Sequence, residues 1–230
     1  MNGAPKLTNL ALVLGGNGDI GGAISDQLQR DGFDVTRAGR KDFSLGSPEQ
    51  IADYFAKNGN QFDVLVHSAG LNHPKLFEEL SDKEIRESLE VNLHGFLQIV
   101  RLCLPHWKEV KSGRIVVISS LYGFLARRAR LPYVTSKHAL NGAVKTLAIE
   151  LASYGILVNS ISPGYIKTKM TSANNSPEVI QKLVSGIPLG KLGEPQDIAE
   201  VASFLCSPKN KYLTGQDIVV DGGFSIGGFQ

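Results

Sequence analysis

The sequence predicts one α/β domain with a doubly wound, mostly parallel sheet and helices on both faces. Apolar runs of strand length alternate along the chain with amphipathic stretches of helix length, which is the pattern of βαβ units. A glycine-rich segment follows the first apolar run directly. No repeat, low-complexity tract or linker divides the 230 residues, so we expect a single domain over residues 1–230.

The expected strands and helices alternate along most of the chain. Short apolar runs predict strands at Leu10–Leu14, Asp34–Arg37, Val64–His67, Ile115–Ser119, Leu157–Ser162 and Ile218–Val220. Helices are expected between them, at about 21–31, 48–58, 82–110, 133–153, 177–186 and 195–206. The connection from Ala38 to Leu45 is too short for a full helix, and Ser47 before Pro48 predicts the next helix start. Any further strand in this connection is therefore very short or reached by a tight loop.

Composition narrows the class of protein. The net charge of +2 gives no indication of a nucleic-acid or membrane partner. No run is long and apolar enough to span a bilayer, and Met1–Asn9 hold no signal-peptide stretch, so the expected location is cytoplasmic. Cys103 and Cys206 lie in apolar contexts and are expected to be packed, reduced thiols. No Cys, His and acidic residues cluster at metal-ligand spacing, so no metal is expected.

The glycine-rich segment Leu14–Gly22 reads LGGNGDIGG and opens the first helix. Glycines at such a junction let the backbone turn tightly and approach a pyrophosphate, and a helix N-terminus favours the anion. The alternative is a strand–helix turn without a ligand. We expect a Rossmann-type dinucleotide site here, with contacts from Gly15, Asn17, Gly18, Asp19, Ile20 and Gly21.

A second pattern indicates proton transfer. Tyr133 and Lys137 are four residues apart and share one face of an expected helix. The lysine cation favours the phenolate and is expected to lower the tyrosine pKa toward the working range. Ser120 supplies a hydroxyl that can hold a carbonyl or alcohol oxygen. Ser119 is the alternative, since neighbouring strand residues point to opposite faces.

Together the loop and the Tyr133–Lys137 pair resemble the short-chain dehydrogenase/reductase family, over Leu10 to Gly223. Gly15 and Gly21 match the outer glycines of the family's G-x-x-x-G-x-G loop. Asp19 stands at the middle glycine, with Gly18 one residue earlier. Because a carboxylate close to a pyrophosphate is repulsive, Asp19 is expected to point away from the phosphates.

Further motifs extend the resemblance along the chain. The family's N-N-A-G motif corresponds to His67-Ser68-Ala69-Gly70, where only the last two residues match. The N-x-x-G motif is present as Asn92–Gly95, and the late Pro-Gly motif as Pro163–Thr168. The C-terminal pattern runs from Leu192–Pro195 to Val220–Gly223.

The resemblance implies a catalytic role for four residues. Tyr133 would be the acid/base, Lys137 would also bind the nicotinamide ribose, and Ser120 would orient the substrate oxygen. Asn92 would hold a water that links the lysine to solvent, or else make a local structural hydrogen bond. His67 is expected to be structural. The nicotinamide contacts implied are Ser68, Ala69, Gly70, Tyr133, Lys137, Pro163, Gly164, Ile166 and Thr168.

The cofactor expected is NADP rather than NAD. Arg40 follows the second strand, Lys41 is beside it, and no acid stands at that strand end. An acid there accepts bonds from the 2′-OH of NAD, whereas arginine suits the 2′-phosphate of NADP. Arg37 is internal to the strand and is a weaker candidate. Asp42 and Phe43 match the family's Asp-aliphatic pair that brackets the adenine.

The function implied is hydride transfer between a nicotinamide cofactor and a secondary alcohol or ketone of small size. Tyr122, Arg127 and Arg128, with Arg130 beside them, are candidate contacts for an anionic substrate; the alternative is a solvated or subunit-contacting basic loop. Residues 121–132 and 169–190 are candidate substrate loops, with the polar stretch 171–177 as a lid. A 3-oxoacyl-acyl-carrier-protein reductase and a non-catalytic dinucleotide-binding regulator are the alternative functions. The resemblance also implies a homotetramer or homodimer.

Overall fold

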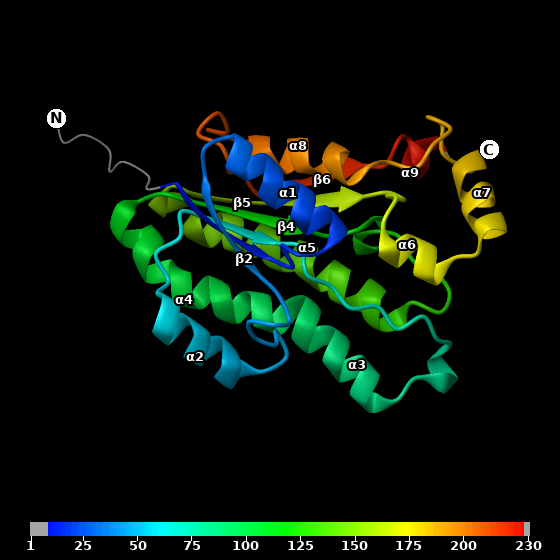
Figure 1. The fold of residues 1–230 in the computed structure, drawn as a ribbon, viewed down its shortest axis with the longest axis horizontal. Coiled ribbons are helices and arrows are strands. Elements are labelled where there is room, and N and C mark those ends of the chain that lie inside the picture. The colour runs from blue at the N-terminus through cyan, green and yellow to red at the C-terminus, as the bar shows by residue number, and fades with distance from the viewer. Residues whose placement is uncertain (1–8, 228–230) are drawn as a thin grey trace.

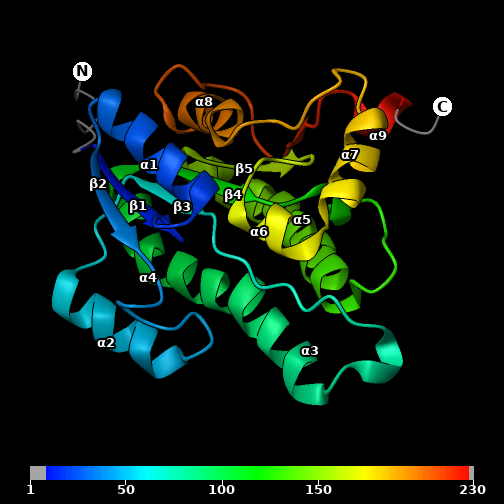
Figure 2. The same cartoon turned by 45° about the vertical axis from the view of Figure 1, so that its right-hand side comes forward.

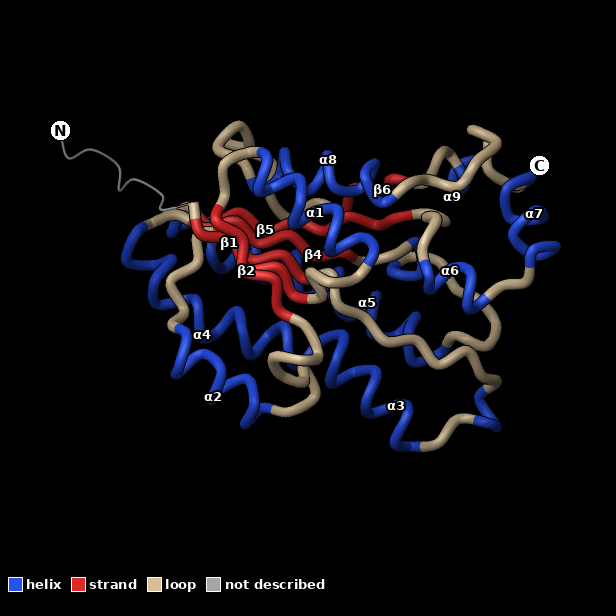
Figure 3. The backbone as a smooth tube through the Cα atoms, viewed as in Figure 1, coloured by secondary structure: helices blue, strands red, loops and turns tan. Residues whose placement is uncertain are grey.

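The computed structural model describes residues 9–227, and within them six parallel strands form one sheet in the order β2-β1-β3-β4-β5-β6 (Figures 1 and 3). The segment Met1–Asn9, in which no signal peptide is expected, lies outside the described residues except for Asn9. The strands are β1 Leu10–Leu14, β2 Asp34–Ala38, β3 Val64–His67, β4 Gly113–Ile118, β5 Ile156–Pro163 and β6 Asp217–Val220. This confirms the predicted fold class.

Helices cover both faces of the sheet. Figure 2 shows α1 and α8 on one face, and α2, α4 and α5 on the other. The helices are α1 Asp19–Arg30, α2 Pro48–Asn58, α3 Asp82–Leu89, α4 Gly95–Val110, α5 Leu131–Leu151, α6 Lys169–Asn174, α7 Pro177–Ser185, α8 Pro195–Cys206 and α9 Phe224–Gly227.

The sheet separates two hydrophobic cores because successive strand residues face opposite sides. In β1, Ala11 and Val13 pack on the side of α1 and α8. Leu12 and Leu14 pack on the other side, together with Phe96 of α4. Each such leucine or valine contributes about 1.5–3 kcal/mol by leaving water.

The single helix expected over 82–110 is interrupted. A π-helical turn over Glu90–His94 separates α3 from α4 and contains Asn92. Gly95 follows directly, and a Cβ added there would lie only 2.3 Å from the Leu45 carbonyl oxygen. The turn therefore occurs where the helix backbone contacts the short connection after β2, and such turns are frequent at functional sites.

Two loop expectations also have definite outcomes. The polar stretch 171–177 is mostly helical, because α6 covers Lys169–Asn174 and α7 begins at Pro177. Hydroxyls within the stretch or just before it cap these helices: Thr168 accepts a bond from Thr171 N, and Ser176 accepts one from Val179 N. Between Gly39 and Ser47 the described chain forms turns and no strand. As a result β2 is an edge strand of the sheet.

The strand order fixes where a ligand can bind. The connection from β1 leads to β2, toward one edge of the sheet, whereas the connection from β3 leads to β4, toward the other edge. The direction of the connections thus reverses between β1 and β3. In open parallel sheets, ligands bind beyond the carboxyl ends of the strands at such a switch point. The helices α6 and α7 lie beyond this same end of the sheet (Figure 2).

Candidate active site

A cavity of about 1030 Å³ opens at the carboxyl ends of the strands. Its walls come from the segments that follow β1 to β5, together with α6. The expected site residues that line it are Gly15, Asn17, Gly18, Asp19, Ile20, Gly21, Arg40, Phe43, Ser68, Ala69, Gly70, Ser120, Tyr122, Arg127, Tyr133, Lys137, Pro163, Gly164, Ile166 and Thr168. Three expected residues do not line it: Asp42, Asn92 and Arg128.

The glycine loop is packed so closely that its outer glycines are required. Gly15 has φ of +76°, and a Cβ on it would lie 2.8 Å from the Ala69 backbone nitrogen. A Cβ on Gly21 would lie 2.2 Å from the Gly15 carbonyl oxygen. Behind this turn α1 begins after Gly18 with no side chain capping it. First-turn N–H groups therefore face the cavity, an arrangement that fits a dinucleotide pyrophosphate.

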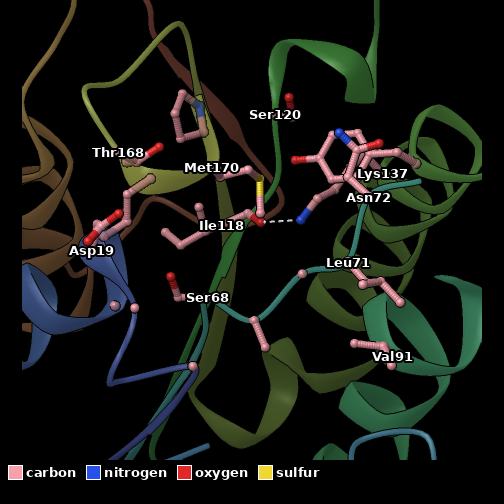
Figure 4. Close-up of a pocket in the computed structure, with 18 of the residues that line it drawn as sticks. Asp19, Ser68, Leu71, Asn72, Val91, Ile118, Ser120, Lys137, Thr168 and Met170 are labelled. Atoms are coloured by element: carbon pink, nitrogen blue, oxygen red, sulfur yellow. Dashed lines mark hydrogen bonds between the residues drawn. The ribbon is translucent and has the colours of Figure 1, made fainter. Parts of the chain in front are cut away.

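Asp19 is directed across the cavity. Its Oδ2 accepts a hydrogen bond of 2.6 Å from the backbone N–H of Lys169, the first residue of α6. Figure 4 shows Asp19 beside Thr168 at this end of the cavity. The carboxylate thus joins the glycine-loop helix to the segment after β5.

The end of the cavity near β2 is basic. Arg40 and Lys41 line it, and both are exposed. The only carboxylates among the described lining residues are Asp19 and Glu87, which come from α1 and α3. Arg37 pairs instead with Asp26 of α1, away from this wall.

The expected adenine-bracketing pair is only partly at the wall. The Asp42 carboxylate accepts a bond of 2.8 Å from Gly39 N and stabilises the turn after β2. Phe43 is 5% exposed, and its ring packs 4.7 Å from the ring of Tyr54. Both side chains therefore stabilise the short connection after β2, which contains no strand.

The catalytic candidates converge where β4 meets α5. Lys137 is buried, and its Nζ donates to the Ile118 carbonyl at 2.7 Å, the dashed line in Figure 4. The same Nζ lies 5.5 Å from the centre of the Tyr133 ring. The Ser120 hydroxyl is close enough to the Tyr133 phenol to lower its pKa. The Ser119 hydroxyl is instead buried with no hydrogen-bond partner among the described residues, so Ser120 is the serine that acts on the phenol.

Burial dominates the acidity of this pair. It raises the pKa of Tyr133 to about 12, while Ser120 and the charge of Arg130 lower it. It lowers the pKa of Lys137 to about 8. Lys137 is not among the groups that lower the tyrosine pKa in this structure, so the expectation that it does so is not confirmed. Near neutral pH Tyr133 is a protonated phenol, and so it is a proton donor.

Asn92 lies behind the cavity. Its Oδ1 accepts from Leu71 N at 2.7 Å, and its Nδ2 donates to the Leu71 carbonyl and to Ser136 Oγ, each at 2.9 Å. A Cβ added to Gly70 would lie 3.8 Å from Lys137 Nζ and 3.9 Å from Asn92 Oδ1. Both polar atoms therefore border the same small space beside Gly70.

His67 is a structural histidine. Its Nε2 lies 3.0 Å from the Asn92 carbonyl oxygen, and its ring stacks on Phe96 with centres 5.0 Å apart. Burial, with the charge of Lys137, lowers its pKa to about 3. The ring is therefore neutral near pH 7, as the sequence interpretation expected.

Aromatic and basic side chains form the remaining wall. The Tyr122 hydroxyl lies 3.0 Å from that of Tyr165 and accepts from Arg127 at 3.1 Å. Arg128 is exposed and outside the cavity, which corrects its expected role, whereas Arg130 is buried and lines it. Tyr165 was not among the expected site residues, although it lies within the Pro163–Thr168 motif. Also missed were Leu71, Asn72, Val91 and Met170, labelled or drawn in Figure 4, which belong to no motif.

The fold and site define a nicotinamide-dependent oxidoreductase of Rossmann type. Residues 44–225 match the family model described as enoyl-(acyl carrier protein) reductase. A 3-oxoacyl-acyl-carrier-protein reductase from Staphylococcus aureus is 35% identical over 243 residues, covering 95% of this chain and 98% of the relative. The corresponding protein from Aquifex aeolicus is 36% identical, with 93% and 96% covered.

Solved structures agree. The 4-hydroxyisoleucine dehydrogenase complexed with NADH superposes with a TM-score of 0.90 and 30% identity, over 95% of this chain and 99% of that one. A protein described as an NAD(P)-dependent gluconate 5-dehydrogenase from Beutenbergia cavernae, with NADP bound at low occupancy, gives 0.90 and 32%, over 95% and 97%. The chain belongs to the short-chain dehydrogenase/reductase family and is an NAD(P)-dependent oxidoreductase, which sets aside the non-catalytic regulator.

Among the helices of residues 9–227, none combines the length and apolarity that crossing a bilayer requires. The same residues contain no group of three or more His, Cys, Asp or Glu side chains placed to hold a metal ion.

Proposed function

We propose that this enzyme reduces a small ketone to a secondary alcohol with NADPH, and that Tyr133 supplies the proton. The observation that carries the proposal is the protonated, buried phenol of Tyr133, which lies beside Ser120 in a cavity that the glycine loop also lines. With a pKa of about 12, this phenol holds its proton throughout the neutral range, and the protonated phenol is the form that ketone reduction requires.

The steps follow from the positions of the side chains. Ser120 donates a hydrogen bond to the carbonyl oxygen of the substrate and holds it beside the Tyr133 hydroxyl. A nicotinamide cofactor held by the glycine loop and Lys137 would supply the hydride that the carbonyl carbon receives. Tyr133 gives its proton to the developing alkoxide and becomes a phenolate, which the Lys137 cation stabilises. A proton from solvent restores the phenol, and oxidation of an alcohol reverses these steps.

We assign the return of this proton to Lys137 and Asn92. Lys137 Nζ and Asn92 Oδ1 border the same space beside Gly70. A water in that space could accept bonds from the lysine and donate to the amide oxygen. The lowered pKa of Lys137, about 8, makes it able to release and regain a proton near neutral pH.

The choice of NADP rests on the basic end of the cavity. Arg40 and Lys41 line this end, and the two lining carboxylates belong to α1 and α3 rather than to the end of β2. A guanidinium there suits a 2′-phosphate, while a 2′-OH would find no acidic acceptor at the strand end. Family neighbours include proteins solved with NADH and with NADP, so the family alone does not determine the choice.

A 3-oxoacyl-acyl-carrier-protein reductase is the second candidate function, favoured by the relatives that are 35–36% identical. The structural neighbours that act on gluconate or 4-hydroxyisoleucine favour a small hydroxy acid instead. We also propose a cytoplasmic enzyme that assembles as a homotetramer or homodimer; size-exclusion chromatography with light scattering tests the assembly.

The test of the mechanism is the Tyr133→Phe variant. It removes one hydroxyl from the cavity and should lower kcat for ketone reduction by at least about a hundredfold, the range of general acid catalysis, with cofactor binding retained. Tyr154→Phe, at a tyrosine outside the cavity, is the matched control and should keep full turnover. Full turnover by the Tyr133→Phe variant would remove the tyrosine from the mechanism.

A further inference from the structure

Two arginines in the cavity wall have no acidic partner among residues 9–227. Arg130 is only 8% exposed, and its hydrogen bond in the structure goes to the carbonyl of the neighbouring Ala129 at 3.0 Å. Arg127, partly buried, donates to the Tyr122 hydroxyl at 3.1 Å and to Asn175 Oδ1 at 3.4 Å. No ion pair of the described residues includes either arginine.

This arrangement leaves positive charge uncompensated inside the protein. Arginines are almost never fully buried unless they are paired, because burying a charge without a partner is costly. Burial and the nearby charge of Arg127 lower the pKa of Arg130 below its ordinary value. The other groups that act on it are the hydroxyls of Tyr122, Tyr165 and Tyr133, and no carboxylate is among them. An anion between the arginines would remove this penalty.

The guanidiniums lie close to the reacting phenol. The Tyr122 ring packs edge-on against the Tyr133 ring with centres 6.4 Å apart, and the hydroxyl of Tyr122 accepts the bond from Arg127. Arg130 is near enough for its charge to act on Tyr133 directly. One small substrate can therefore place an anionic group at the arginines and its ketone at Tyr133 at the same time.

We propose that Arg130 and Arg127 bind the carboxylate of a short oxo acid, or of the corresponding hydroxy acid. A planar guanidinium matches a carboxylate through two parallel N–H···O bonds. Asn175, between α6 and α7, would then hold Arg127 in place when this segment covers the substrate. The assignment rests on the proposed function of Tyr133. It makes a substrate with a neutral thioester beside its ketone a poor match for this wall.

The conformation of the loop supports a dedicated role for Arg130. Ala129 has φ of +60°, in the left-handed region that a residue with a Cβ rarely adopts. The next residue, Arg130, is the N-cap of α5, three positions before Tyr133, and its side chain does not cap the helix. The strained turn at Ala129 therefore places Arg130 at the N-terminal end of α5, the same end of the helix that carries Tyr133.

The test compares an oxo acid with its uncharged form. For the wild type with NADPH, kcat/KM for 4-oxopentanoate should exceed that for its methyl ester by at least about thirtyfold, since losing one partner of a buried charge pair has effects of this size or larger. Arg130→Met and Arg127→Met should each remove most of this preference, because they lower kcat/KM for the acid far more than for the ester. Arg130→Lys should restore part of it, because lysine keeps the charge but not the fork.

Arg128→Met is the matched control, since it removes the same charge from the same loop at an exposed residue outside the cavity. It should keep the full preference for the acid. Equal use of acid and ester by the wild type, or an equal loss of preference in Arg128→Met, would overturn the proposal while leaving the hydride transfer intact.

Binding of succinate to the NADPH complex, measured by calorimetry, provides a readout that does not need turnover and that also controls for misfolded variants. Succinate binding that weakens at least tenfold in Arg127→Met and Arg130→Lys, but not in Arg128→Met, supports the carboxylate site. If the wild type shows this binding but turns over neither acid nor ester, the proposed reaction fails and the site stands. Succinate binding that is the same in all variants would overturn the site.

Discussion

The carboxylate of Asp19 accepts a 2.6 Å hydrogen bond from the backbone N–H of Lys169, which lies 150 residues later in the chain. Asp19 is the first residue of α1 and Lys169 the first of α6, so this bond joins two helix starts across the cavity. In the family's G-x-x-x-G-x-G loop pattern, the position of Asp19 is a glycine, which has no side chain to make such a bond. The bond therefore gives the segment after β5 an attachment that the family pattern does not provide.

We expect Asp19→Ala to loosen the start of α6. Hydrogen bonds to charged groups contribute about 1.5–3 kcal/mol, and this one is partly exposed, so protection of the Lys169 amide should fall by about tenfold in hydrogen exchange. Asp19→Asn keeps a neutral acceptor and should lose less. Asp26→Ala, which removes the partner of Arg37 in the same helix, is the control. Unchanged protection in Asp19→Ala would show that the bond does not hold α6.

The sequence predicted the sheet and most of the site because these depend on local patterns. Periodicity located all six strands, and the spacing of Tyr133 and Lys137 identified the helix face that meets Ser120. The interruption at Glu90–His94 was missed because it depends on a contact between Gly95 and Leu45, far apart in the sequence. The same reason hid Tyr165, whose place in the cavity depends on Tyr122. For Arg127, Arg128 and Arg130, only the folded loop distinguishes which ones face the cavity.

His67 should make the protein sensitive to acid. Its pKa of about 3 in the folded state lies below the ordinary value of 6.5, so only the unfolded chain gains this proton between those values. Stability should therefore fall by about 3 kcal/mol as the pH drops from 6.5 to 4, on account of this group. Urea unfolding of His67→Asn, which can still donate to the Asn92 carbonyl, should show a flatter dependence on pH. Phe96→Leu loses the stacking partner and should be less stable but keep the slope; an equally steep slope in His67→Asn would contradict the assignment.

Gly21→Ala should abolish cofactor binding or destabilise the fold. The new Cβ would lie 2.2 Å from the Gly15 carbonyl oxygen, so either the turn or the first helical turn of α1 must move. Gly22→Ala is an adjacent control, because its Cβ would meet Gly16 O at an ordinary 3.7 Å. That variant should bind cofactor normally and be more stable by about 0.5–1 kcal/mol, as expected for glycine to alanine inside a helix. Thermal unfolding and cofactor titration of both variants distinguish the two effects, and normal binding by Gly21→Ala would show that the turn adapts.

The two directions of the reaction should respond differently to pH. Tyr133 must be protonated to reduce a ketone and ionised to oxidise an alcohol. With a pKa of about 12, the phenolate fraction grows about tenfold for each pH unit across the neutral range, while the phenol fraction stays near one. Oxidation should therefore rise steeply between pH 7 and 10, and the reductive step should not follow that rise. Arg130→Met removes a charge that lowers the tyrosine pKa and should move the oxidative rise to higher pH. An oxidative plateau already at pH 7 would mean that the working tyrosine is far more acidic than its burial predicts.

The cofactor preference should depend on Arg40. Arg40 lines the basic end of the cavity, whereas Arg37 is already paired with Asp26. The same substitution at each arginine therefore tests which of the two binds the 2′-phosphate. Arg40→Gln should weaken NADPH binding by about tenfold, the lower end for a charge-assisted hydrogen bond because this side chain is exposed. NADH binding should hardly change, because NADH carries no 2′-phosphate for Arg40 to contact. Arg40→Asp should go further and improve NADH binding, because a carboxylate at the end of β2 can accept hydrogen bonds from the ribose hydroxyls.

Arg37→Gln is the control and should leave the affinities for NADPH and NADH unchanged. Dissociation constants from fluorescence titration of each variant give the ratio directly; an unaltered ratio in Arg40→Gln would transfer the role to Lys41, the other cation at this end of the cavity.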